Sequence, residues 1–276
     1  MSRLLTRGAL YLFLIALSVP LVFPFLWMVS SALKLPGDVL ASPPQLVPAE
    51  VTWDNIRDVF TFQPFARQVY NSLYIATLVA LFTCVLSLLS GYAFARLRFP
   101  GRNVLFFLFL SALMLPVEVT LIPNFSLMKA LGFADTHVPL LALPVFGATG
   151  VTGVFLMRQF IQSIPVELEE AAMIDGMGRL RILLHVILPL TRPMLGTIGI
   201  IAFLYSWNSF LEPLVFVNRS ELFTVPLALT AFTDTSGNPI WGVQMAATAI
   251  STVPLLLAYL VARRQITESL AQTGIK

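Results

Sequence analysis

Charged residues are scarce in this chain of 276 residues. Only 11% of them are Asp, Glu, Lys or Arg, whereas 57% are hydrophobic. Soluble domains carry about 25% charged residues, so the composition excludes an ordinary soluble fold and predicts an all-α polytopic membrane protein. The net charge of +3 does not indicate nucleic-acid binding, because the basic residues cluster in short gaps between apolar runs, where they orient a protein in the membrane.

Cysteine and histidine are rarer still. The single cysteine, Cys84, lies inside an apolar run, so it forms no internal disulfide and no thiolate metal cluster. The two histidines, His137 and His185, fall on opposite sides of the membrane in the topology given below and cannot share a metal ion. We therefore expect no metal site and no cofactor in this chain.

Motifs of catalysis are also missing. The sequence has no HExxH and no Walker-type phosphate loop, and no serine has an obvious histidine partner within the membrane. Two other functions stay open at this point. One is an intramembrane transferase, which would need an Asp-rich or His-containing cavity. The other is a secondary transporter that uses Glu118 for protons.

Long apolar runs make up most of the sequence. Each of six runs is long enough to cross a bilayer as a helix of about 20 residues. The expected spans are residues 10–32, 72–95, 104–128, 138–161, 194–217 and 243–262. The first run follows Arg3 and Arg7, as in a signal peptide, but its length favours an uncleaved span. We expect residues 1–276 to form a single transmembrane domain.

The distribution of lysine and arginine predicts the orientation. With the N-terminus in the cytoplasm, 12 of the 17 basic residues fall on the cytoplasmic side and 5 on the outer side. Because short cytoplasmic loops are enriched in basic residues, both termini are expected in the cytoplasm. The proline-rich stretch 33–67 then lies outside, as a compact cap with a short helix near residues 53–60, and the charged loop 163–192 lies inside.

Polar residues within the apolar runs are candidates for a solute pathway. A charge in lipid costs at least ~2.5 kcal/mol, so Glu118 should face protein or water. It either lines a pathway or bonds to backbone groups that Pro116 or Pro123 leaves free. Asn124, at the same end of the run, has the same two interpretations.

A second polar group interrupts the fifth run. Trp207 offers a stacking surface for a sugar ring, and Asn208 either contacts solute or forms an interhelical hydrogen bond, the usual role of polar residues in membrane bundles. Glu212 lies near the outer end of this run, where snorkelling to water is a sufficient explanation.

The stretch 165–189 is the most charged part of the chain. Pro165 suits a helix N-terminus, where the carboxylates of Glu167, Glu169 and Glu170 are stabilised by the helix dipole. The spacing places Leu168, Ala171, Ala172 and Asp175 on one face. Gly176 and Gly178 then break the helix, and a second short helix is expected to end at Pro189, with an apolar face of Leu180, Leu183, Leu184 and Ile187. These residues alone fit a hairpin on a lipid surface.

The order and spacing of this stretch resemble the EAA loop of binding-protein-dependent ABC transporter permeases. Glu170-Ala171-Ala172 is followed after three residues by Gly176, and after nine more by Val186-Ile187-Leu188-Pro189, with Val186 in place of isoleucine. Further stretches resemble the maltose-type carbohydrate permeases: 72–96, 99–101, 115–123, 158–165 and 207–214. The C-terminal tail departs from the Gly- and Ala-rich tail of that subset.

The resemblance implies a type I ABC importer permease fold, with six transmembrane helices and a cytoplasmic coupling helix between the fourth and the fifth. The chain would not be an enzyme. It would lie in a bacterial or archaeal plasma membrane and translocate a sugar or sugar derivative. Its partners would be a second, related permease subunit in a heterodimer, two ATP-binding subunits that hold ATP and Mg, and an extracytoplasmic solute-binding protein. The coupling residues would be Glu169, Glu170, Ala171, Ala172, Asp175, Gly176, Leu188 and Pro189.

Overall fold

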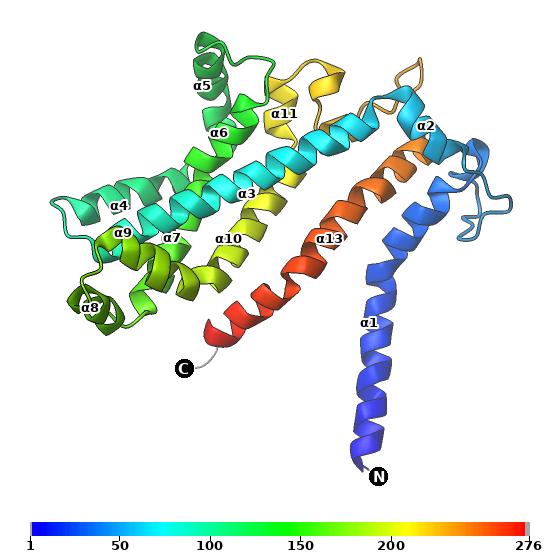
Figure 1. Cartoon of the computed structure of the whole chain (residues 1–276). Helices are drawn as coiled ribbons and strands as arrows, with labels where there is room; N and C mark the ends of the chain where they lie inside the picture. The colour runs from blue at the N-terminus through cyan, green and yellow to red at the C-terminus, as the bar shows by residue number, and fades with distance from the viewer. Residues whose placement is uncertain (1, 274–276) are drawn as a thin grey trace. The chain divides into compact units, whose positions relative to one another are not determined.

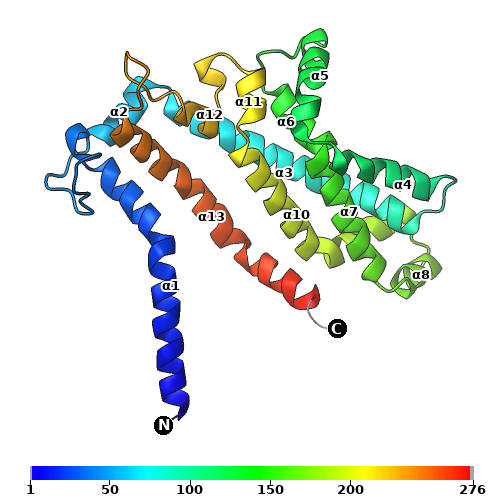
Figure 2. The same cartoon turned by 180° about the vertical axis from the view of Figure 1, so that it is seen from behind.

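The computed structural model describes residues 2–273, and side chains within 10–258 and at 260. No β-strand forms among residues 2–273; an isolated β-bridge joins Thr233 to Pro239. The expected all-α class is confirmed. The longer helices are α1 (Ser2–Ala32), α3 (Phe65–Arg96), α7 (Ala148–Ser163), α10 (Leu188–Asn208) and α13 (Trp241–Thr273) (Figures 1 and 2). Shorter helices are α2 (Asp54–Phe62), α4 (Arg102–Ser111), α5 (Val117–Ala130), α6 (Val138–Phe146), α8 (Glu167–Ile174), α9 (Arg179–Ile182), α11 (Leu211–Phe216) and α12 (Val225–Leu229).

The chain forms two compact units. The first consists of residues 1–66 and 228–253, and the second consists of residues 67–227 and 254–276. The organisation of the chain as a single domain stays a prediction.

In the first unit, the segment after α1 folds as a compact cap that contains the short helix α2. The amide of Asn55 donates to the backbone carbonyls of Ala32, at 3.1 Å, and Lys34, at 2.7 Å. The ammonium of Lys34 is buried and lies 4.1 Å from the ring centroid of Trp27, in a cation–π contact. These contacts tie the cap to the end of α1.

In the second unit, α3, α7 and α10 pack closely because small residues lie between them. A Cβ at Gly91 of α3 would lie 2.7 Å from the side chain of Met157 in α7. A Cβ at Gly153 of α7 would lie 2.2 Å from the Ser87 hydroxyl in α3 and 3.1 Å from Ile198 in α10. Small residues permit this approach of backbones, which drives helix association in lipid.

The expected span 104–128 is interrupted in the structure. It consists of α4 and α5, whose axes meet at 102°. The break falls at Leu115, which is extended with φ −87° and ψ 118°, because the ring of the following Pro116 disfavours a helical conformation at the preceding residue. The described residues hold five helices long and apolar enough to cross a membrane, or six if this bent pair is one span.

The expected span 194–217 begins earlier and ends earlier. A π-helical turn, Leu183–Ile187, joins α9 to α10, so the helix runs without interruption to Asn208. Pro189 therefore does not end a helix, contrary to the expectation. The wider π turn before it relieves the clash that a proline ring makes with the carbonyl four residues earlier in an α-helix. Residues 211–216 form the separate helix α11.

Candidate functional site

The charged stretch forms the helix–glycine–helix hairpin that the sequence predicts. Helix α8 ends at Ile174, and Gly176 follows two residues later with a φ of +81°. The N–H of Gly176 donates to the carbonyl of Met173, and the N–H of Met177 donates to the carbonyl of Ala172, each at 3.0 Å. This pair of bonds is a Schellman motif, in which a left-handed glycine ends the helix and turns the chain.

The four residues predicted to share one face of α8 do not all face the same way in the structure. Glu169 and Ala172 are buried, whereas Leu168 is 45% exposed. Leu168, Ala171 and Asp175 are exposed together, as the predicted shared face requires, and only Ala172 departs from it. An ion pair of Glu169 with another helix, rather than apolar periodicity, decides which side of α8 faces the protein. Four residues of the EAA stretch remain on the outward surface: Glu170, Ala171, Asp175 and Gly176.

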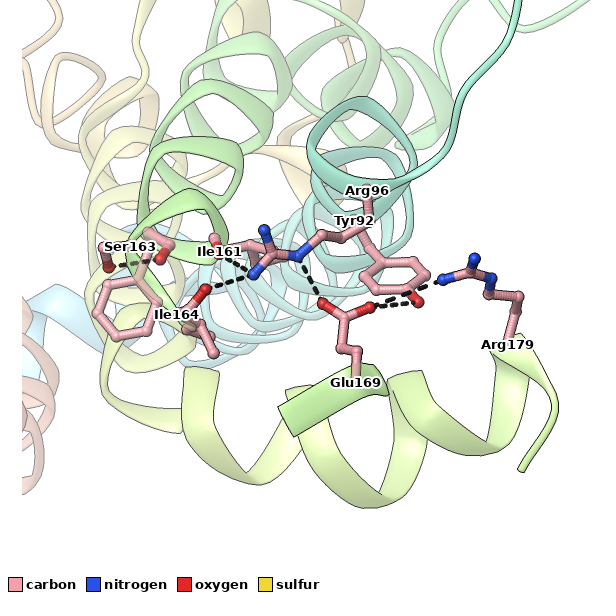
Figure 3. Close-up of polar contacts among 8 residues, drawn as sticks. Tyr92, Arg96, Ile161, Ser163, Ile164, Glu169 and Arg179 are labelled. Atoms are coloured by element: carbon pink, nitrogen blue, oxygen red, sulfur yellow. Dashed lines mark hydrogen bonds and ion pairs between the residues drawn. The ribbon is translucent and has the colours of Figure 1, made fainter. Parts of the chain in front are cut away.

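Glu169 is held by three side chains from two other helices (Figure 3). The Arg96 Nε donates to the Glu169 carboxylate at 2.5 Å, and the Tyr92 hydroxyl donates to its second oxygen at 3.0 Å. The guanidinium of Arg179 lies 4.0 Å away. With 1% of its side chain exposed, Glu169 is an interior anchor of α8.

Arg96 also connects Glu169 to the C-terminal end of α7. Its Nη2 donates to the carbonyls of Ile161, at 2.9 Å, and Ile164, at 2.5 Å, where α7 ends (Figure 3). The last carbonyls of a helix have no partner within it, and an arginine that binds them satisfies the backbone and complements the helix dipole. One guanidinium thus joins the C-termini of α3 and α7 to α8.

The second arm of the hairpin also presents a different face from the expected one. Ile182, Leu183 and Ile187 are buried, whereas Leu180 is 65% exposed and Leu184 is also exposed. The four residues predicted to form one apolar face therefore divide between two sides, with Leu183 and Ile187 in the protein interior and Leu180 and Leu184 on the outer surface. Of the two further coupling candidates, Leu188 is half-buried and Pro189 is exposed at the start of α10.

A cavity of about 170 Å³ lies where three expected spans are broken: between α4 and α5, between α6 and α7, and between α10 and α11. Its polar lining residues are Thr120, Asn124, Thr149, Tyr205 and Glu212. Backbone that leaves the helical path at membrane depth is tolerated where it is buried in protein or lines such a cavity.

Of the four residues predicted for a solute pathway, only Asn124 lines this cavity. Glu118 is exposed. Trp207 is buried and stacks on Phe203, with ring centroids 5.9 Å apart, so it offers no surface to a sugar. The amide of Asn208 donates to the Leu204 carbonyl in its own helix, at 2.7 Å, rather than to a neighbouring helix.

Sequence reasoning missed the central group of the cavity. Glu212 does not snorkel to water; only 8% of it is exposed. Its carboxylate accepts hydrogen bonds from the Tyr205 hydroxyl, at 2.8 Å, and from the Ser209 hydroxyl. The i, i+4, i+7 spacing of these three residues is a signal that points to one helix face, although α10 ends within it.

These features define a class: a multi-pass helical membrane protein whose EAA-type hairpin is anchored on the ends of its membrane helices. Residues 84–270 match the family described as "Binding-protein-dependent transport system inner membrane component". The chain belongs to this family.

Relatives match along most of the chain. The Escherichia coli K12 protein named inner membrane ABC transporter permease protein YcjP is 31% identical, over 100% of this chain and 98% of its own. The diacetylchitobiose uptake system permease protein DasC of Streptomyces coelicolor is 31% identical, over 95% and 94%. The sn-glycerol-3-phosphate transport system permease protein UgpE of Yersinia pestis is 32% identical, over 86% of each. These relatives are transport permeases.

The fold itself is that of a known importer subunit. A chain in the crystal structure of a bacterial ABC transporter for the import of the acidic polysaccharide alginate superposes with a TM-score of 0.82. The match covers 96% of this chain and 97% of that one, at 21% sequence identity. The predicted ABC importer permease fold is confirmed.

Proposed function

We propose that this chain is the permease subunit of an ATP-driven ABC importer that moves a sugar or sugar derivative across a plasma membrane. Family membership and the permease relatives support the importer, and the name of the diacetylchitobiose relative supports a carbohydrate substrate. In this proposal a second permease subunit forms a heterodimer with this chain in the surrounding lipid. An extracytoplasmic protein delivers the solute, and two ATP-binding subunits hold the ATP and Mg.

The anchored hairpin is the observation that carries this proposal. The exposed surface of α8, formed by Glu170, Ala171, Asp175 and Gly176, would dock in a cleft of an ATP-binding subunit. Because Glu169 ties α8 to Arg96, a displacement of α8 would be passed to α3 and α7 rather than absorbed by a loop. The continuous helix that starts at Arg179 would pass it to α10 through Leu188 and Pro189.

The orientation is part of the proposal. Both termini and the hairpin would be cytoplasmic, as supported by the 12 basic residues of 17 that this arrangement places inside. The chain itself would carry no catalytic group. None of the relatives described above is a secondary transporter or a transferase. Uptake that is driven by an ion gradient in the absence of ATP would contradict the proposal.

Substitutions at Gly176 test the docking surface. No atom lies within 4 Å of the position of a Cβ at Gly176, but its φ of +81° suits few side chains. Asparagine and aspartate both tolerate this conformation, so they form a matched pair that differs in charge. We expect Gly176→Asp to lower ATP-dependent uptake at least tenfold, and Gly176→Asn to keep more than half of it. Glu170→Lys should behave as Gly176→Asp does.

The measurement is uptake by proteoliposomes that contain the whole importer, together with copurification of the ATP-binding subunits. Membrane insertion of each variant serves as the control, and all should insert as the wild type does. Normal uptake and normal copurification in both Gly176→Asp and Glu170→Lys would contradict a docking role for α8.

A further inference from the structure

The cavity between the broken spans brings polar side chains from four helices to one place. Asn124 belongs to α5, Thr149 to α7, Tyr205 to α10 and Glu212 to α11. The amide of Asn124 makes no hydrogen bond within the described part of the chain, although it lines the cavity. An amide with free donors and a free acceptor at membrane depth is available to a ligand or to water.

Glu212 places a buried carboxylate at this cavity. Its two partners, Tyr205 and Ser209, both donate a hydroxyl group to it. Among the residues whose side chains are described, no lysine or arginine forms an ion pair with it. A carboxylate offers about four acceptor positions, so about two remain for hydroxyl or ammonium groups of a solute.

Among the residues that line the cavity, Glu212 alone has a charged side chain. The first turn of α7 also lines the cavity, at Ala148 and Thr149, and its N–H groups would favour an anion. A helix N-terminus is equivalent to about half an elementary charge, whereas each carboxylate carries a full one. The only full charge in the wall of the cavity is therefore a negative one.

We infer that this cavity is a binding site on the solute pathway for a hydroxyl-rich solute that carries no negative charge, such as a neutral sugar or an amino sugar. The inference rests on the proposed function and narrows its substrate class. Solute hydroxyls would donate to Glu212 and exchange hydrogen bonds with Asn124. A phosphorylated polyol or a uronate would meet the carboxylate with a like charge. The chain would then differ in substrate charge from its glycerol-phosphate relative, despite 32% identity.

A cysteine placed in the cavity tests its accessibility and charge without knowledge of the substrate. The chain has a single natural cysteine, Cys84, so a Cys84→Ser, Asn124→Cys chain carries one thiol. The whole importer in proteoliposomes would be treated with methanethiosulfonate reagents that carry either an ammonium or a sulfonate group. We expect the ammonium reagent to react at least tenfold faster, relative to a free thiol in solution, and Glu212→Gln to reduce that preference at least threefold.

The matched control places the thiol at Asn238, in an exposed loop, where Glu212→Gln should leave the preference unchanged. An unreactive thiol at position 124, a preference for the sulfonate reagent, or a preference unaffected by Glu212→Gln would each overturn the inference. None of these readouts depends on transport, so they stand even if the importer moves another class of solute.

Uptake provides the second test. With a binding protein that accepts the probe, we expect the wild-type importer to take up diacetylchitobiose at least tenfold faster than sn-glycerol 3-phosphate. Glu212→Gln should slow diacetylchitobiose uptake about tenfold, whereas Glu221→Gln, at an exposed position, should not. Faster uptake of the phosphate compound overturns the inference and leaves the proposed function intact. Uptake that does not require ATP counts against the proposed function. In that case the cysteine-labelling experiment is the test of the inferred site.

Discussion

Replacing Glu169 by glutamine is expected to destabilise the chain and to abolish ATP-driven uptake, whereas the same change at the adjacent Glu170 is expected to leave stability unchanged. Glu169 is buried against Arg96, and Glu170 is exposed. Removing one partner of a buried ion pair costs roughly 3–5 kcal/mol, because it leaves the other charge without compensation. Substitutions at two adjacent glutamates of α8 should therefore impair uptake for different reasons.

Thermal unfolding in detergent and copurification of the ATP-binding subunits separate the two effects. Glu169→Gln should lower the unfolding temperature. Glu170→Gln should weaken subunit association at an unchanged unfolding temperature. A double-mutant cycle with Arg96→Met isolates the pair, and its coupling energy should reach about 1–3 kcal/mol. If Glu169→Gln matched the wild type in both stability and uptake, the Glu169–Arg96 ion pair would neither stabilise the chain nor couple the movement of α8 to α3 and α7.

A leucine at Gly153 is expected to prevent α3, α7 and α10 from packing at all. Even the Cβ of an alanine there would lie 2.2 Å from the Ser87 hydroxyl and 3.2 Å from Thr83. Overpacking by single methylene groups typically costs about 1–3 kcal/mol, and leucine adds three further carbons. We expect Gly153→Leu to yield no monodisperse protein and Gly153→Ala to lower the unfolding temperature by several degrees.

The rescue for this prediction lies on the facing helix. Ser87→Gly removes the nearest atom, so the Ser87→Gly, Gly153→Ala chain should recover most of the loss seen in Gly153→Ala alone. Gly178→Ala is the matched control, because no atom lies within 4 Å of its Cβ position and its φ is −75°. A fully stable Gly153→Leu chain would contradict the close approach of these helices.

The helical class and the hairpin were predictable because their signals are local. Apolar runs of about 20 residues specify spanning helices by length alone, and Gly176 specifies the turn that ends α8. The break at Leu115 also has a local cause, since it precedes Pro116. The sequence analysis missed this break because the residues on both sides of it are apolar, and composition alone does not distinguish one straight helix from two.

The positions of Glu169 and Glu212 were not predictable in the same way. Glu169 faces inward because of Arg96, which lies 73 residues earlier, and a helical pattern carries no information on such a partner. Glu212 belongs to a short helix that follows a break in the backbone. Its burial depends on α5, α6 and α7 closing around it, which is a property of the fold rather than of the local sequence.

The π turn at Leu183–Ile187 determines the angular phase of the rest of α10. Successive residues of an α-helix are about 100° apart, so one extra residue in a turn rotates everything beyond it by about that angle. With the turn wound as an ordinary α-helix, Ile198 would point away from Gly153 of α7, although 11 residues, or about 16 Å of helix, separate it from Ile187. The winding of five residues beside the hairpin thus decides which side chains of α10 pack against α7.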